Sequence, residues 1–261
     1  APLILAINRS VLGDSLPALR ILPALCGAIT VLLAAWMAAK LGGRTFAQML
    51  AALCVATAPL YLGFFSFFST NCFEIVLWTL VFCTLLQLGQ SEDHRLWWLL
   101  GGLAGTAVMT KHTSVFLIVA IVAATLISPM RRHITSRHFW IGAGLMVLVM
   151  LPNLSWQVRH DWASLEFYLA NDRLHNVPTS MFGVLGGQLS SFNLAAFPVW
   201  LAGLYLLLVS KVGKPHRIAG WTAAILYAAL LLSGKSRTDR IQGVYPIPLL
   251  SQLAGSRRTG A

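Results

Sequence analysis

The sequence predicts an all-α protein that crosses a membrane about eight times. The chain is 57% hydrophobic and 10% charged, whereas soluble domains carry about 25% charged residues. Its apolar runs approach the length that a bilayer core requires, and short polar loops separate them. We expect residues 1–250 to form one transmembrane domain with interfacial helices, and residues 251–261 to form a disordered tail.

The first three spans lie before residue 90. A short, mildly amphipathic segment, Pro2 to Asp14, precedes them. Pro59 falls inside the second span, where neighbouring helices can satisfy the carbonyl that a proline leaves without a donor. In order, these spans are expected at about Ile21 to Ala39, Phe46 to Phe65 and Glu74 to Leu88.

The apolar run from Leu96 to Ser128 is too long for one straight span. At about 1.5 Å per residue it would reach about 50 Å, against a hydrocarbon core of about 30 Å. Polar segments flank it, and Thr110 to Thr113 interrupts it near the middle. We therefore expect a hairpin of two short spans whose turn, Lys111-His112, lies on the side opposite the flanks.

Three further spans and one long polar loop follow the hairpin. The loop, from about Trp156 to Ser180, is the largest expected extramembrane segment, and such loops often carry function. The residues from Met181 onward are expected to begin with an interfacial or half-inserted helix. The spans are expected at about Phe139 to Leu151, Ala195 to Val209 and Ile218 to Leu232, after which Gly234 to Gly243 returns to the outer face.

The charge pattern favours a membrane and its lipids as partners. A net charge of +11 would indicate nucleic acid in a soluble protein. Here the basic residues lie in short loops, where membrane orientation and lipid phosphates explain them, so we expect no nucleic-acid partner. The acidic residues favour a working site on the outer side, where six of them are expected: Asp14, Glu74, Asp161, Glu166, Asp172 and Asp239.

Lys111 and His112 are the first candidates for a binding site. An ammonium at a membrane turn needs an anion or water-filled cavity nearby. One interpretation is that these residues bind an anionic substrate group, and the alternative is a lysine that extends to the lipid headgroups. Glu74, which follows Asn71 at a helix start, either complements the helix dipole or contacts a substrate or metal beside a lipid phosphate.

The outer loop offers a weaker candidate for a divalent cation. Asp161 and Glu166 can present two carboxylates to a metal, although polar loops are solvated by default. The four cysteines show no CxxC or Cys/His metal spacing, so we expect them to pack inside spans. The chain also contains no phosphate-cradling glycine loop, nucleophile elbow or HExxH motif. Small-residue spacing at Gly101 and Gly105 predicts close helix packing.

An ordered set of segments resembles the bacterial family 39 glycosyltransferases, relatives of dolichyl-phosphate-mannose protein mannosyltransferases and lipid A aminoarabinose transferases. The resemblance extends over nearly the whole chain. The segments are LGDSLPALRILPALCGA (Leu12 to Ala28), FSTNCFEIVLWTL (Phe68 to Leu80), TKHTSVFL (Thr110 to Leu117), LPNLSWQVRHDWASLEF (Leu151 to Phe167), NVP (Asn176 to Pro178), PVWLAGL (Pro198 to Leu204) and YPIPLL (Tyr245 to Leu250).

The resemblance implies a GT-C-type enzyme of the bacterial inner membrane. Such an enzyme transfers a sugar from a polyprenyl-phosphate donor, here undecaprenyl phosphate, to a lipid, glycan or protein acceptor outside the cytoplasm. Basic residues hold the leaving phosphate, and Lys111, His112, Lys235 and Arg20 are the expected ones in this chain. Preorganised cations would stabilise the charge that the phosphate gains as the sugar leaves.

The resemblance also places the expected catalytic base outside this sequence. The family carries an acidic pair upstream of a His-Pro-Pro-Leu-like segment, and this chain starts at Ala1-Pro2-Leu3 without an initiator Met or a signal peptide. We therefore expect a fragment of a longer transferase. Lys235 is followed by Ser-Arg-Thr-Asp-Arg where the family usually has a Tyr pair and a Pro.

Two alternatives to a transferase follow from the same sequence. A transporter or lipid-flipping permease would also contain broken helices and intramembrane charges, although the chain shows no clear internal repeat. A non-catalytic remnant of the transferase family would keep the fold and bind lipid. Consumption of the donor in detergent discriminates between an enzyme and a transporter, because a transporter needs two compartments.

Overall fold

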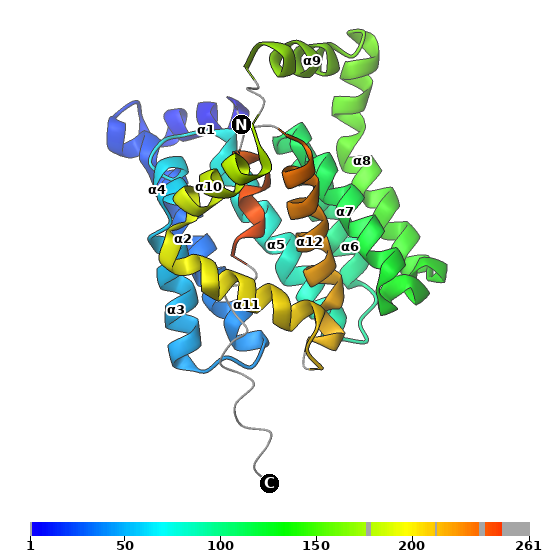
Figure 1. The fold of residues 1–261 in the computed structure, drawn as a ribbon. Helices are drawn as coiled ribbons and strands as arrows, with labels where there is room; N and C mark the ends of the chain where they lie inside the picture. The colour runs from blue at the N-terminus through cyan, green and yellow to red at the C-terminus, as the bar shows by residue number, and fades with distance from the viewer. Residues whose placement is uncertain (1, 176–178, 212, 235–237, 247–261) are drawn as a thin grey trace.

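The computed structural model describes residues 2–175, 179–211, 213–234 and 238–246, and all regular elements in these ranges are helices (Figure 1). In chain order they are α1 (Pro2–Leu12), α2 (Leu16–Lys40), α3 (Thr45–Ala56), α4 (Pro59–Phe64), α5 (Thr70–Gln90), α6 (Leu96–Thr110), η1 (His112–Ser114), α7 (Val115–Ile127), η2 (Pro129–Thr135), α8 (Arg137–Arg159), α9 (Ala163–His175), α10 (Met181–Phe192), η3 (Leu194–Ala196), α11 (Phe197–Leu208), η4 (Lys214–His216), α12 (Arg217–Leu232) and η5 (Thr238–Val244). The predicted tail, 251–261, lies outside the described residues.

Three described helices are long and apolar enough to cross a membrane: α2, α5 and α8. Two bent pairs bring this number to five if each pair counts as one span. One pair joins the segment His112–Ile127 to η2 through a 103° bend, and the other joins α10 to Leu194–Leu208 through a 99° bend. The eight predicted spans also include shorter apolar helices such as α3 and α6.

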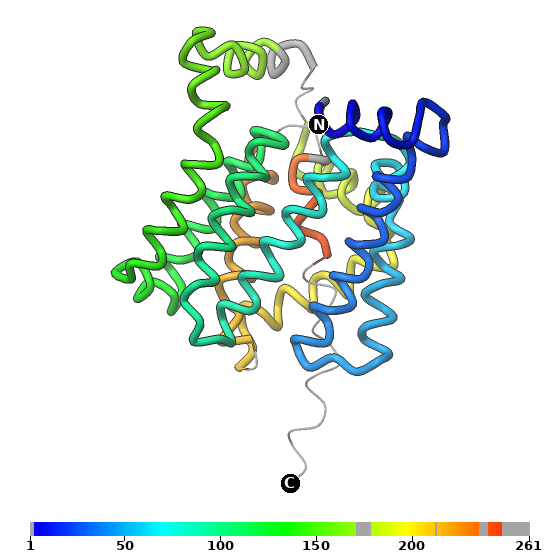
Figure 2. The backbone as a smooth tube through the Cα atoms, turned by 180° about the vertical axis from the view of Figure 1, so that it is seen from behind, coloured from blue at the N-terminus to red at the C-terminus, as the bar shows by residue number. Residues whose placement is uncertain are grey.

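The predicted hairpin is present. Helix α6 ends at Thr110, Lys111 is extended with φ −155° and ψ 123°, and α7 starts at Val115. Figures 1 and 2 show α6 rising to this break and α7 returning from it. We call this end of the bundle the Lys111 end and the opposite end, where α8 begins, the Arg137 end.

Prolines change two of the expected boundaries. The predicted second span divides into α3 and α4 because Pro59 supplies no N–H, and Ala58 before it is extended. Pro152, in contrast, lies inside α8, which continues to Arg159 instead of ending near Leu151. The expected loop after that point contains α9, which lies across the end of α8 in Figure 1.

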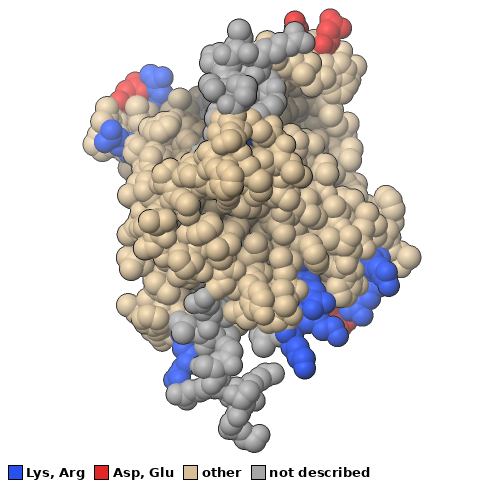
Figure 3. Space-filling model, viewed as in Figure 1, with Lys and Arg blue, Asp and Glu red and all other residues tan. Residues whose placement is uncertain are grey.

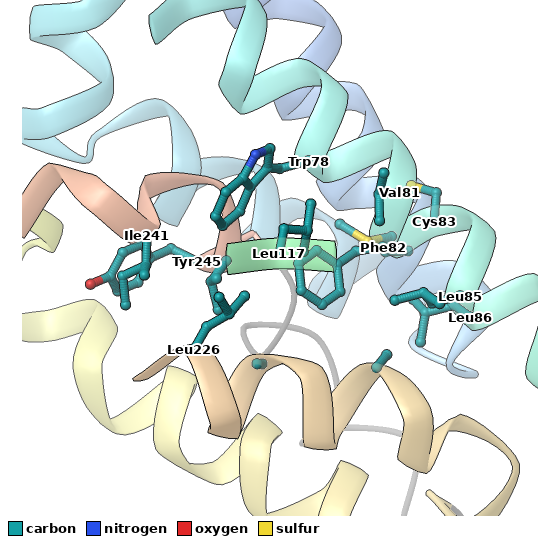
Figure 4. Close-up of a cluster of buried hydrophobic side chains, with 14 of the residues drawn as sticks. Trp78, Val81, Phe82, Cys83, Leu85, Leu86, Leu117, Leu226, Ile241 and Tyr245 are labelled. Carbon is teal, nitrogen blue, oxygen red and sulfur yellow. The ribbon is translucent and has the colours of Figure 1, made fainter. Parts of the chain in front are cut away.

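The core lies along α5, which packs against α2, α6, α12 and η5. Trp78, Phe82 and Leu85 of α5 are fully buried, and Leu117 of α7 and Leu226 of α12 pack in the same cluster (Figure 4). In contrast, α8 is largely exposed and packs mainly on α6. Helix α5 is therefore the scaffold on which polar groups at the Lys111 end can be held in place.

Candidate functional site

A buried polar network occupies the Lys111 end of the bundle. Glu74 in α5 is fully buried. Its Oε2 accepts hydrogen bonds from Lys111 Nζ at 2.9 Å and from Gln242 Nε2 at 2.5 Å. Its Oε1 accepts a hydrogen bond from Thr113 Oγ1 at 3.0 Å, and Lys111 Nζ also donates to Asn71 Oδ1 at 2.9 Å. One cation and two neutral donors therefore satisfy the buried carboxylate.

The α6–α7 break positions the ammonium of this network. Because Lys111 leaves the helical conformation, its side chain can reach α5, where it forms an ion pair with Glu74. The Lys111 side chain is 17% exposed, whereas that of Glu74 is 0% exposed. Trp78 Nε1 donates to Ser114 Oγ at 2.9 Å, which fixes the short η1 turn on α5. The ammonium therefore lies between a buried carboxylate and the surface.

Helix η5 closes the network from the C-terminal side. Tyr61 of α4 is buried, and its hydroxyl donates to the Gln242 carbonyl at 2.7 Å. The next residue, Gly243, lies against Trp78, since a Cβ at this glycine would come within 2.3 Å of the Trp78 Cβ. Gln242 is therefore held from both its backbone and its side chain, in contact with Glu74.

His112 points to a different helix from Lys111. Its Nε2 lies 3.1 Å from Asn153 Oδ1 of α8, and its ring is in edge contact with that of Tyr168 in α9, at 5.9 Å between centroids. Gln157 of α8 is buried beside His112, and its Oε1 accepts from the Ser164 N–H at the start of α9. Lys111 and His112, which are adjacent in the sequence, therefore have different partners: Lys111 contacts Glu74, and His112 contacts the corner between α8 and α9.

The structure does not include Asp161 and Glu166 in the buried network. Both side chains are exposed, near or in α9, where Asp161 and Trp162 have positive φ angles of 50° and 58°. Figure 1 shows this segment standing away from the rest of the described bundle. Within the described part of the chain, no group of three His, Cys, Asp or Glu residues is placed to hold a metal ion.

Arg20 lies at a surface pocket whose lining does not include Lys111. This pocket, about 440 Å³ in volume, lies between α1, the start of α2 and the segment before α5, and Phe67 and Phe68 line it together with Arg20. Arg9 and Asp14 form an ion pair on its rim. Arg20 is exposed. Lys235, the fourth predicted phosphate ligand, lies outside the described residues.

Sequence reasoning missed three partners of the network and of His112. Gln242 lies 168 residues from Glu74 along the chain, and Asn153 lies 41 residues from His112, so no local pattern indicated either contact. Thr113 was named only as part of the polar interruption in an apolar run. Thr113 follows Lys111 by two residues, and the break between α6 and α7 turns the side chains of both residues toward Glu74.

Comparison with known proteins confirms the fold. The chain is similar to the crystal structure of ArnT from Cupriavidus metallidurans bound to undecaprenyl phosphate, with a TM-score of 0.71 and 17% identity over 95% of this chain and 48% of that one. For the apo state of the same protein the TM-score is 0.66 and the identity 19%, over 95% and 47% of the two chains. The chain thus spans about half the length of these structures. A search of curated proteins gave no match.

A family model supplies the second comparison. Residues 1–156 match the model for dolichyl-phosphate-mannose-protein mannosyltransferase. This range includes the hairpin, Asn71, Glu74 and Lys111, and it ends inside α8. The match covers more than half of the chain and agrees with the all-helical, multi-pass membrane fold. The chain therefore belongs to the dolichyl-phosphate-mannose-protein mannosyltransferase family.

Proposed function

We propose that this chain forms part of a membrane glycosyltransferase that takes a sugar from a polyprenyl-phosphate donor. The family match over residues 1–156 carries the proposal. The structure of the similar ArnT with undecaprenyl phosphate supports this donor class. The acceptor would be a lipid, a glycan or a protein, and the reaction would take place at the Lys111 end, on the outer face of a bacterial inner membrane.

In this proposal Lys111 binds the donor phosphate and Glu74 positions Lys111. The phosphate gains negative charge as the sugar leaves, and a cation fixed in advance stabilises that charge without reorganisation. Glu74 is fully buried behind Lys111 and accepts from two further donors. It is therefore suited to orient the ammonium, and less suited to contact substrate itself.

His112 and Arg20 would serve different parts of the same donor or of the acceptor. His112 contacts Asn153 of α8 and Tyr168 of α9, so its position would depend on the α8–α9 corner, which carries Asp161 and Glu166. Arg20 borders an open pocket with two aromatic side chains, a combination that suits a phosphate attached to an apolar or sugar group. We extend the phosphate-binding proposal to Lys235 from the family resemblance alone.

The position of the charged network favours an enzyme over a transporter. Transporter substrate sites commonly lie near the bilayer midplane, between discontinuous helices. Here Lys111 follows the last residue of α6, Asn71 lies in the first turn of α5, and the ion pair joins these two helix ends. The charges are thus gathered at one end of the bundle.

The test measures consumption of a polyprenyl-phosphate-linked sugar by the intact protein in detergent. We expect Lys111→Ala to lower turnover at least 100-fold, because one preorganised donor in such sites is worth about 10²–10³ in rate. Lys40→Ala is the matched control, since Lys40 is an exposed lysine at the C-terminal end of α2, outside the Glu74–Lys111 network. Near-normal turnover of Lys111→Ala would contradict the phosphate-binding role.

A second variant separates loss of function from loss of structure. Lys111→Ala alone leaves a buried carboxylate without its cation, which costs about 3–5 kcal/mol in a fully buried pair, and less here because Lys111 is partly exposed. The double variant Glu74→Gln/Lys111→Met removes both charges together. We expect it to insert and to unfold near the wild-type temperature, and to remain inactive.

A further inference from the structure

Four arginines form a collar at the Arg137 end of the bundle. Arg95 precedes α6, Arg131 and Arg132 lie in η2, and Arg137 begins α8. All four are exposed. Figure 3 shows several groups of Lys and Arg atoms along the lower edge of the molecule and others at the upper left, whereas the Asp and Glu atoms in view lie mainly at the upper edge. We call these four residues the arginine collar.

Close helix packing brings the collar together. Gly101 of α6 lies directly against Gly142 of α8, because a Cβ at Gly101 would lie 1.9 Å from the Gly142 carbonyl oxygen. The first turns of α6 and α8 are therefore adjacent, and both carry the positive end of a helix dipole. An anion at this junction would be attracted by the start of α8 as well as by the arginines.

The short helix η2 presents two of the arginines outward. It follows α7 after a 103° bend, and its Met130 and His133 are buried. Trp97 Nε1 of α6 donates to His133 Nδ1 at 3.0 Å, which anchors η2 to the bundle. Because these two side chains face inward, the intervening Arg131 and Arg132 face away from the protein and are exposed.

The protein offers these arginines little negative charge. Among the described residues, the ion pairs are Arg9–Asp14 and Lys111–Glu74, and neither involves the collar. The Asp93 carboxylate accepts from the backbone N–H of Arg95 at 2.9 Å, in the turn just before α6. Glu92 is the other acidic residue near η2. The collar thus retains an excess of positive charge at the surface.

We propose that the arginine collar binds the phosphate of an anionic phospholipid headgroup. Exposed Trp140 lies at the same junction, with its Nε1 donating to the Ile134 carbonyl at 2.8 Å, and a tryptophan held in this way is typical of the membrane–water interface. Arginines around a phosphate at the end of membrane helices form short, charge-assisted hydrogen bonds. The lipid would clamp α6, η2 and α8 together.

The test counts lipids retained by the intact, detergent-solubilised protein in native mass spectrometry. Short-chain phosphatidylglycerol is compared with short-chain phosphatidylcholine, and we expect selective retention of the anionic lipid. The variant Arg131→Gln/Arg132→Gln/Arg137→Gln should lose about 100-fold in affinity, the product of about fivefold for each arginine near a membrane surface. Its thermal unfolding in the absence of added lipid should match the wild type, since these side chains are exposed.

Two controls distinguish a lipid site from a diffuse surface potential and from a site for free phosphate. The control variant Lys40→Gln/Arg44→Gln/Lys214→Gln removes the same charge from exposed positions outside the collar. An equal loss in this variant would show a diffuse surface potential and overturn the proposal. Inorganic phosphate and glycerol phosphate are titrated as competitors of phosphatidylglycerol. If either binds as tightly as the lipid, the collar is a site for free phosphate and the lipid proposal is wrong. The proposal is also overturned if the collar variant keeps wild-type retention.

Discussion

The contact between α6 and α8 allows a sharp test of the fold, through Gly101→Ala. The added Cβ would lie 1.9 Å from the Gly142 carbonyl oxygen and 2.6 Å from its carbonyl carbon. Ordinary van der Waals contact begins at 3.4 Å, so the helices must move apart by about 1.5 Å at this point. Both neighbours are backbone atoms, and a rotamer change cannot relieve the clash.

The expected cost is about 1–3 kcal/mol, the usual range for overpacking. Alanine also favours a helix over glycine by about 1 kcal/mol, which offsets part of that cost. Gly102→Ala is the matched control, because it makes the same change one residue along α6, where no atom lies within 4 Å of the added Cβ. Gly102→Ala should therefore be neutral or stabilising.

The assay compares thermal unfolding of the two purified variants in the same detergent. We expect Gly101→Ala to unfold at a lower temperature than Gly102→Ala by several degrees. Separation of the helices would also displace η2, because Trp97 of α6 donates to His133. If both variants unfold at the same temperature, α6 and α8 do not meet at Gly101 and Gly142.

Two further predictions concern groups outside this contact. Burial lowers the pKa of His133 below its usual 6.5, and the neighbouring His94 and Arg132 add to this effect. The folded protein should therefore lose stability as the pH falls below about 6.5, since the unfolded chain binds the proton more readily. Between pH 7.5 and 5, the unfolding temperature of His133→Phe should decline less than that of the wild type. Tyr61→Phe should cost about 0.5–1.5 kcal/mol by removing the hydrogen bond to the Gln242 carbonyl, and hydrogen exchange in η5 should rise; unchanged exchange in η5 would show that this bond does not hold the helix.

The sequence predicted the elements that composition and length determine. A run as long as Leu96–Ser128 cannot remain straight within a bilayer, so the hairpin and its turn at Lys111 followed from geometry. The helix boundaries were harder to predict, because a proline can start a helix or lie inside one. Pro59 begins α4 and Pro152 lies within α8, and only the packing around each residue decides between these outcomes.

The candidate site shows the same limit more sharply. A lysine at a membrane turn had to have an anionic or hydrated partner. The sequence offered an anionic substrate group or the lipid headgroups, and it did not pair Lys111 with Glu74. The structure places Glu74 against Lys111, with Gln242 donating to the same carboxylate oxygen and Thr113 to the other. A buried carboxylate with one cation and two neutral donors is satisfied without substrate, so a donor phosphate would meet an ammonium that is already oriented. The proposed phosphate site therefore depends on distant Gln242 as well as on the adjacent Thr113, and such dependence appears only after the chain has folded.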